Sequence, residues 1–129
     1  MQKLEYESAM GSSPTPLSEH QKVEKLAGDR DVFGDGSLTI LSTPGHTPGH
    51  QSLLVKLPKT GAIILTGDIV HFQYMWDNKV VPAFNFSREQ SLASIDRIAG
   101  LSAAHKAKLW IGHDKDIASK MNRAPKYYE

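Results

Sequence analysis

The sequence of 129 residues contains no cysteine, which excludes disulfide bonds and thiolate metal ligands. It also has almost no excess of charge, because 15 lysines and arginines balance 14 aspartates and glutamates to a formal net charge of +1. The basic residues are scattered, so neither nucleic acid nor an anionic membrane is expected as a partner. A metal site in this chain has to use histidine and carboxylate ligands.

Long apolar runs are missing as well. No run approaches the ~20 residues that a membrane-spanning helix needs, and the first residues, MQKLEYESAMG, lack the apolar core of a signal peptide. These features predict a cytoplasmic protein, unless a natural N-terminus that bears a signal has been lost. The length fits one domain with ordinary proportions of apolar and charged residues.

Runs of β-prone residues separated by turn signals predict several short strands. Pro58 to Gly61 has the composition of a hairpin loop, so the runs on either side of it are expected to pair. The expected strands cover residues 31–33, 38–41, 51–57, 62–65 and 109–111.

Helices are predicted where apolar residues recur at a period near 3.6. Ser87 and Gln90 form a capping-box pattern, with Ser87 as the N-cap and Gln90 reaching back to it. Residues 69–86 show no clear period but many aromatics, and a structureless loop of that length is usually functional. The expected helices cover residues 1–10, 18–26, 88–104 and 115–122, with a breaker-rich loop at 11–16.

Four residues with metal-binding side chains stand beside glycine at expected strand ends: His46, His50, Asp68 and His113. A strand end holds a side chain in a fixed place, and glycine lets the backbone turn so that side chains point into a shared cleft. Imidazole and carboxylate are the donors expected for zinc, iron or manganese. A single histidine after a turn is more often a surface or structural residue, so the inference depends on the order of the motifs.

That order resembles a known family. STPGHTPGHQSLLV, LTGDIVHF and IGHD resemble successive metal motifs of the metallo-β-lactamase superfamily, and VPAFNFSREQSLASIDRI is similar to a stretch of its N-acyl-homoserine lactone lactonases. The resemblance implies an α+β fold with a mostly antiparallel sheet and flanking helices. Residues 1–129 would form a single partial domain, the C-terminal αβ half of the αββα sandwich.

The resemblance implies a role for each residue that matches a family ligand. His46 would ligate a first metal ion, Asp68 would bridge two ions, and His113 would ligate the second. The family motif HxHxDH, which supplies four further ligands, is absent, since no HxH occurs in the sequence. His20 and His105 cannot replace it, because each is isolated and expected to be exposed.

Three neighbouring residues are given other roles. His50 would be a structural residue that supports the ligands, and Asp114 would be a helix cap or a hydrogen-bond acceptor. His71 lies where some lactonases have a tyrosine that donates to the substrate carbonyl. It is therefore either a catalytic contact of that kind or an ordinary loop residue.

By this resemblance the complete protein is a metal-dependent hydrolase that opens a lactone or cleaves an ester. Two zinc ions, or iron, manganese or cobalt in their place, would lower the pKa of a bound water toward ~7 and so hold a bridging hydroxide. Asp68 would pass a proton, and His71 would stabilise the developing oxyanion. Since part of the ligand set is missing, this chain is expected to be inactive or impaired by itself.

Two alternatives remain open at the level of sequence. One is another hydrolase of the superfamily, such as a glyoxalase II-like thioesterase. The other is a non-catalytic remnant that self-associates as a homo-oligomer, because half of the fold leaves a sheet face uncovered.

The aromatic-rich segment has two interpretations. Its large apolar side chains could line a channel for an acyl chain, but for any single one packing against the sheet or helix is favoured. Trp110, in an expected strand, is predicted to lie in the core. The segment's side chains in question are Phe72, Tyr74, Met75, Trp76, Phe84 and Phe86.

Overall fold

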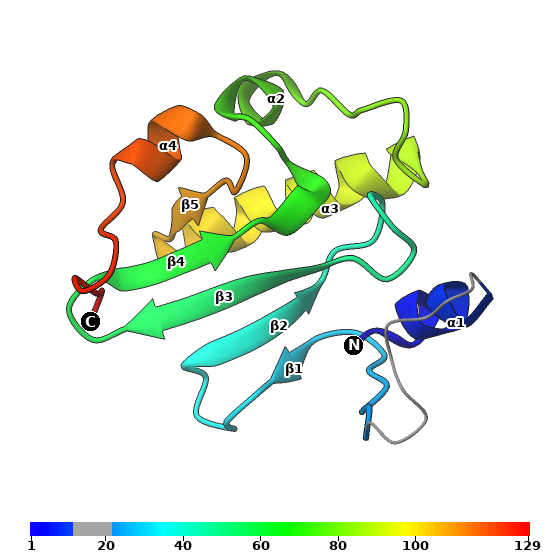
Figure 1. Cartoon of the computed structure of the whole chain (residues 1–129), viewed down its shortest axis with the longest axis horizontal. Helices are drawn as coiled ribbons and strands as arrows, with labels where there is room; N and C mark the ends of the chain where they lie inside the picture. The colour runs from blue at the N-terminus through cyan, green and yellow to red at the C-terminus, as the bar shows by residue number, and fades with distance from the viewer. Residues whose placement is uncertain (12–21) are drawn as a thin grey trace.

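The computed structural model describes residues 1–11 and 22–129 (Figure 1). His20 and most of the loop expected at 11–16 lie outside the described residues. The helix expected at 18–26 is not found in its described part, where Leu26 instead forms a parallel bridge with Gln2.

Five strands of the described chain form one sheet in the order β1-β2-β3-β4-β5. The first four pair antiparallel, whereas β4 and β5 pair parallel. A parallel neighbour requires a crossover, and the long helix α3 (Arg88–His105) lies between these two strands in the chain. The strands are β1 (Arg30–Asp31), β2 (Leu38–Ser42), β3 (Gln51–Leu57), β4 (Gly61–Leu65) and β5 (Lys108–Trp110). The mixed sheet with flanking helices confirms the expected α+β class.

The shorter helices lie around the sheet, with α2 and α4 on the side of β5 and α1 on the side of β1 (Figure 1). The expectation of an irregular segment over residues 69–86 is wrong in part, because α2 occupies six of those residues. A helix of fewer than two turns is too short to show a period in the sequence. These helices are α1 (Lys3–Gly11), the 3₁₀ turn η1 (Gly67–Ile69), α2 (Gln73–Asn78) and α4 (Lys115–Ser119).

The start of α3 is joined to the loop that follows β2. The Oγ atom of Ser87 accepts from the backbone N–H of Gln90, as the capping pattern predicts. The backbone N–H of Ser87 donates to the carbonyl of Gly45 at 3.0 Å, which takes the place of the reciprocal bond expected from Gln90. A Cβ on Gly45 would lie 2.4 Å from the backbone nitrogen of Ser91, so only glycine allows this contact.

The core lies between α3 and one face of the sheet. Leu54 and Ile64 are register partners on β3 and β4 and share that face with Leu41 of β2. Ile95 and Ile98 of α3 pack against them and are almost fully buried. Burying side chains of this size stabilises the fold by about 1.5–3 kcal/mol each, so the helix is held firmly on the sheet.

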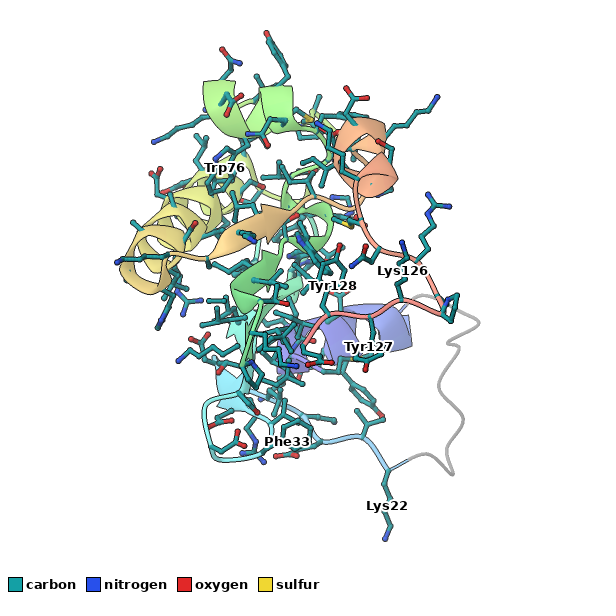
Figure 2. The ribbon with its side chains drawn as sticks, turned by 90° about the vertical axis from the view of Figure 1, so that its left-hand side faces the viewer. Lys22, Phe33, Trp76, Lys126, Tyr127 and Tyr128 are labelled. Carbon is teal, nitrogen blue, oxygen red and sulfur yellow. The ribbon has the colours of Figure 1, made fainter. Side chains whose placement is uncertain are left out.

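Trp110 lies on the other face, contrary to the expectation of a core position. It is the register partner of Leu65, which in turn pairs with Leu53, and these three side chains line a hollow of about 400 Å³. Its ring packs edge-on against Tyr128, with centroids 4.8 Å apart. Tyr128 belongs to the C-terminal segment that runs beside the sheet (Figure 2).

Among the described helices, none has both the length and the apolar character needed to cross a membrane.

Candidate metal centre

The connection of the strands brings three loops to one edge of the sheet. Because β2 and β4 are both antiparallel to β3, they run in the same direction, and β5 runs parallel to β4. The C-terminal ends of these three strands therefore meet. His46 follows β2, Asp68 follows β4, and His113 follows β5.

The carboxylate of Asp68 has one histidine at each oxygen. The Nε2 atom of His113 lies 2.9 Å from Oδ1, and the Nε2 atom of His46 lies 3.7 Å from Oδ2. The three residues that the sequence predicted as metal ligands are thus brought together. The side chain of His46 is mostly buried, whereas those of Asp68 and His113 are about half exposed.

His50 supports Asp68 from the other side. Its Nε2 atom accepts from the backbone N–H of Asp68 at 2.9 Å, and its Nδ1 atom donates to the carbonyl of Thr43 at 3.0 Å. The bonds require the neutral imidazole with its proton on Nδ1. Burial lowers the pKa of His50 and favours this form, although the bond to Thr43 and the carboxylate of Asp68 oppose the shift.

Buried hydroxyls complete this support. Ser52 donates to the carbonyl of Thr66, the residue just before η1, and Thr43 lies 2.9 Å from Ser52. Gly67 has φ of +59°, and a Cβ there would lie 2.7 Å from Nε2 of His50. Both the backbone conformation and the close contact require glycine. The expected structural role of His50 is confirmed by these contacts.

Asn85, which the sequence analysis did not identify, determines which ring nitrogen of a neutral His46 bears the proton. Nδ1 of His46 lies 3.1 Å from Oδ1 of Asn85. The amide nitrogen of Asn85 donates to Oγ of Ser91, whose own proton goes to the carbonyl of Ser87. The oxygen of Asn85 is thereby left to face His46, so a neutral His46 bears its proton on Nδ1.

This arrangement leaves the Nε2 lone pair of His46 facing Oδ2 of Asp68. Two acceptors at 3.7 Å repel each other unless a proton or a cation lies between them. A metal-bound histidine usually donates its other ring N–H to a fixed acceptor, and Asn85 is such an acceptor. We found no sequence signal that would have identified Asn85, because it lies 39 residues from His46 in the segment without a period.

His71 belongs to the same cluster. Its ring centroid lies 5.0 Å from that of His113 and 5.6 Å from that of His46. Asp68, His71 and His113 each offer a ligand atom, and these atoms lie within 4.8 Å of one another. His71 therefore lies close to the carboxylate of Asp68 as well as to the imidazoles of His46 and His113.

The three histidines act on the charge of Asp68. Partial burial by itself raises the pKa of Asp68, but the hydrogen bond from His113 and the charges of His113, His46 and His71 outweigh it and lower that pKa. Burial lowers the pKa of His71, against the opposing effect of Asp68. The cluster thus favours a carboxylate beside a neutral imidazole at His71, which is the donor state that metal ions need.

Asp114 is a helix cap, one of the two roles expected for it. Its carboxylate accepts from the backbone N–H groups of Asp116 and Ile117 at the start of α4, and from that of Gln73 at the start of α2. These bonds lower the pKa of Asp114, the bond from Gln73 most. His105 ends α3 and is exposed, as expected.

The aromatic-rich segment divides into two sets. Met75 and Trp76 of α2 pack against the core cluster, and Trp76 lies in the region between α2 and α3 (Figure 2). For the other four the packing interpretation is wrong, since each is half exposed or more. Those four side chains are Phe72, Tyr74, Phe84 and Phe86.

Two of the exposed aromatics border the cluster formed by Asp68 and the three histidines. Phe72 and Phe84, with Met75 and Pro82, line an apolar hollow of about 390 Å³ that also touches His71 and His113. A second hollow of about 440 Å³ borders Asp68 itself and is lined mainly by polar residues, which include His46, His50 and Glu5 of α1. The cluster is therefore accessible from an apolar and from a polar side.

Comparison with known proteins agrees with the motifs. The N-acyl homoserine lactonase AttM of Rhizobium radiobacter is 40% identical over 98 residues, which are 76% of this chain and 37% of that protein. An N-acyl homoserine lactonase of a Bacillus species is 33% identical over 130 residues, which cover 98% of the chain and 51% of the relative. The chain is a partial homologue of the N-acyl homoserine lactonases. It spans about half or less of the length of the curated relatives it matches.

About half of the fold of a solved lactonase is present as well. A solved N-acyl homoserine lactone hydrolase, which holds the product N-hexanoyl-L-homoserine at its catalytic metal centre, matches 99% of the chain with a TM-score of 0.89 and 29% identity. The chain covers 51% of that structure. No family model matches the sequence. The neighbour's metal centre and the donor atoms of Asp68, His71 and His113 together support a metal cofactor.

Proposed function

We propose that this chain is the C-terminal half of a metal-dependent hydrolase that opens N-acyl homoserine lactones. The main observation is the carboxylate of Asp68, which has an imidazole of His113 near one oxygen and that of His46 near the other. In this arrangement Asp68 would share the binding of divalent metal with His46 at one oxygen and with His113 at the other. The similarity to N-acyl homoserine lactonases over 76% to 98% of the chain supports lactones as the substrate class.

The donor set fits a divalent metal. In this proposal His46, Asp68 and His113 are the ligands that the chain supplies, and the lone pair of His46 that faces Asp68 supports a cation between them. Zinc is the first candidate, because imidazole and carboxylate are among its ordinary ligands, and iron, manganese and cobalt accept the same donors. Such cations polarise a substrate carbonyl and make water a better nucleophile at neutral pH.

Two residues of the chain would act on the substrate or its protons. Asp68 is held as a carboxylate by the surrounding histidines, so it can accept a proton from the attacking water and pass it to the departing alcohol. His71, beside His113, would donate to the carbonyl oxygen as negative charge develops there. Opening the ring then yields a hydroxy acid.

The apolar hollow supports a substrate with an acyl chain. Phe72, Met75, Pro82 and Phe84 surround it on the side where His71 and His113 lie. An acyl chain bound there would place its carbonyl end near Asp68, His71 and His113. Its binding would be favoured because it removes the apolar surface of the exposed aromatic side chains from water.

In this proposal the remaining metal ligands come from polypeptide outside residues 1–129, which form a partial domain. The chain matches relatives of about twice its length, so its activity by itself is expected to be weak or absent. The same observation favours a second candidate, a non-catalytic remnant. The half-buried sheet face around Leu53, Leu65 and Trp110 would then be covered by a second copy.

Assays on the purified chain test these candidates. N-hexanoyl-L-homoserine lactone, a linear ester and a glutathione thioester are offered at neutral pH, with zinc and with a chelator, and Asp68→Asn is the control. We expect slow zinc-dependent opening of the lactone that Asp68→Asn removes. Faster cleavage of the thioester would assign a thioesterase. Absence of both turnover and zinc binding would assign the remnant, and turnover that Asp68→Asn leaves unchanged would refute the proposed site.

A further inference from the structure

The imidazole ring of His71 lies close to that of His113, with centroids 5.0 Å apart. The donor atoms of Asp68, His71 and His113 lie within 4.8 Å of one another, and this set does not include His46. Nε2 of His113 is already 2.9 Å from Oδ1 of Asp68. Within the described chain, these three residues thus form a donor group that needs no contribution from the loop after β2.

The separation suits a single ion after small side-chain rotations. Zinc lies 2.0–2.1 Å from imidazole nitrogen, so tetrahedral neighbours are about 3.3 Å apart. The pair His113 and Asp68 is slightly closer than this, with a proton in the hydrogen bond where an ion would lie. The ligand atoms of the three residues are at most 4.8 Å apart, which exceeds the separation of two donors on one zinc ion by about 1.5 Å.

The backbone that presents these donors is firmly held. Ile69 and Val70, which separate Asp68 from His71, are each 1% exposed. Ile111, two residues before His113, is fully buried. The backbone that bears the donors therefore keeps its place without a ligand, so binding an ion costs less conformational entropy than it would in a mobile loop.

We propose that Asp68, His71 and His113 form a three-donor site that holds one divalent cation without His46 and without any ligand from outside the chain. The inference rests on the proposed function for the assignment of Asp68 and His113 as metal ligands, and it changes the role of His71 from substrate donor to ligand. Two imidazoles and one carboxylate with an open fourth position suit zinc or ferrous iron. The apolar hollow borders His71 and His113, so a substrate bound there would lie beside the ion.

Metal titration of the chelator-treated chain tests the proposal without any assay of activity. Zinc is titrated by calorimetry, and cobalt is followed by its visible absorption, which reports the number and kind of ligands. His71→Gln removes the imidazole but keeps an N–H donor. His46→Gln tests whether the loop after β2 contributes a ligand, and His105→Gln, at the exposed end of α3, is the matched control. Circular dichroism and a thermal melt of each variant show whether it is folded.

We expect one ion per wild-type chain. We expect His71→Gln to weaken zinc binding at least tenfold, as even loss of a residue behind a ligand costs about 10–100-fold, and to change the cobalt spectrum. We expect the zinc affinity of His46→Gln to stay within about threefold of the wild-type affinity. A folded His71→Gln variant that binds like the wild type would overturn the inference, as would a wild-type chain that binds no ion.

The same titration separates this inference from the proposed function. Zinc binding could be unchanged in His71→Gln but abolished in His46→Gln, Asp68→Asn and His113→Gln. In that case the three-donor site is wrong, and the ligand set of the proposed function stands. If Asp68→Asn and His113→Gln also leave zinc binding unchanged, the proposed function fails.

Discussion

The imidazole of His50 lies directly behind the carboxylate of Asp68, and its Nε2 atom accepts the backbone N–H of Asp68 at 2.9 Å. The sequence repeats TPGH twice, yet the two histidines face different partners. His46 faces the Oδ2 atom of Asp68, whereas His50, which is partly buried, contacts the backbone N–H of Asp68. The repeat therefore supplies one residue that faces Asp68 and one that holds the Asp68 backbone.

The bond between His50 and Asp68 predicts that acid destabilises the metal-free chain. Burial lowers the pKa of folded His50 from its ordinary value of 6.5. The unfolded chain thus binds a proton near pH 6.5, and the folded chain only at lower pH. The free energy of unfolding should fall as the pH drops below 6.5 and on through the lower folded-state pKa.

Urea unfolding of the wild type and of His50→Gln across this range measures the effect. Glutamine can accept the Asp68 N–H and does not titrate, so its acid limb should be flatter. Equal pH slopes in the two proteins would show that His50 does not contribute.

The contact between Gly67 and His50 predicts a large difference between two glycine substitutions. Gly67→Ala introduces a Cβ 2.7 Å from the imidazole at a φ of +59°, and it should cost about 1–3 kcal/mol. Gly100→Ala lies inside α3 with no atom within 4 Å of the new Cβ, and it should stabilise by up to about 1 kcal/mol. Urea denaturation compares them, and a Gly67→Ala protein as stable as the wild type would contradict the prediction.

The bond from His46 to Asn85 predicts the tautomer of His46. Nitrogen NMR of the metal-free chain at about pH 9, where imidazole is neutral, should show the proton on Nδ1. Asn85→Leu has a similar volume but no acceptor, so the preference for Nδ1 should disappear. Ser91→Ala removes only the partner of the Asn85 amide and should reduce the preference less. A wild-type His46 with its proton on Nε2 would rule out this arrangement.

The apolar hollow predicts a dependence on acyl length, given the proposed function. Phe84 lines the hollow, and Tyr74, which is similarly exposed, does not. Phe84→Ala should weaken binding of N-decanoyl-L-homoserine roughly tenfold and that of N-butyryl-L-homoserine much less. Tyr74→Ala should change neither. Calorimetry on the zinc-loaded chain measures both affinities, and equal losses for the two ligands would place the acyl chain elsewhere.

Local sequence was sufficient for most of the secondary structure. The strand at 51–57 and the start of α3 at Ser87 agree with the structure because alternation, turn residues and caps act over a few positions. The six-residue α2 escaped prediction, since it is shorter than two helical turns. Trp110 was placed in the core wrongly, because a β-prone run does not say which face of a sheet is covered.

By itself, the sequence determined which residue types stand at the strand ends, and so where His46, Asp68 and His113 could meet. Only the tertiary structure decided that Asn85 faces His46, that His50 lies behind Asp68, and that His71 joins His113. The reason is physical: these contacts join positions far apart in the chain, and they depend on how α3 and the connecting loops pack, for which no local pattern exists.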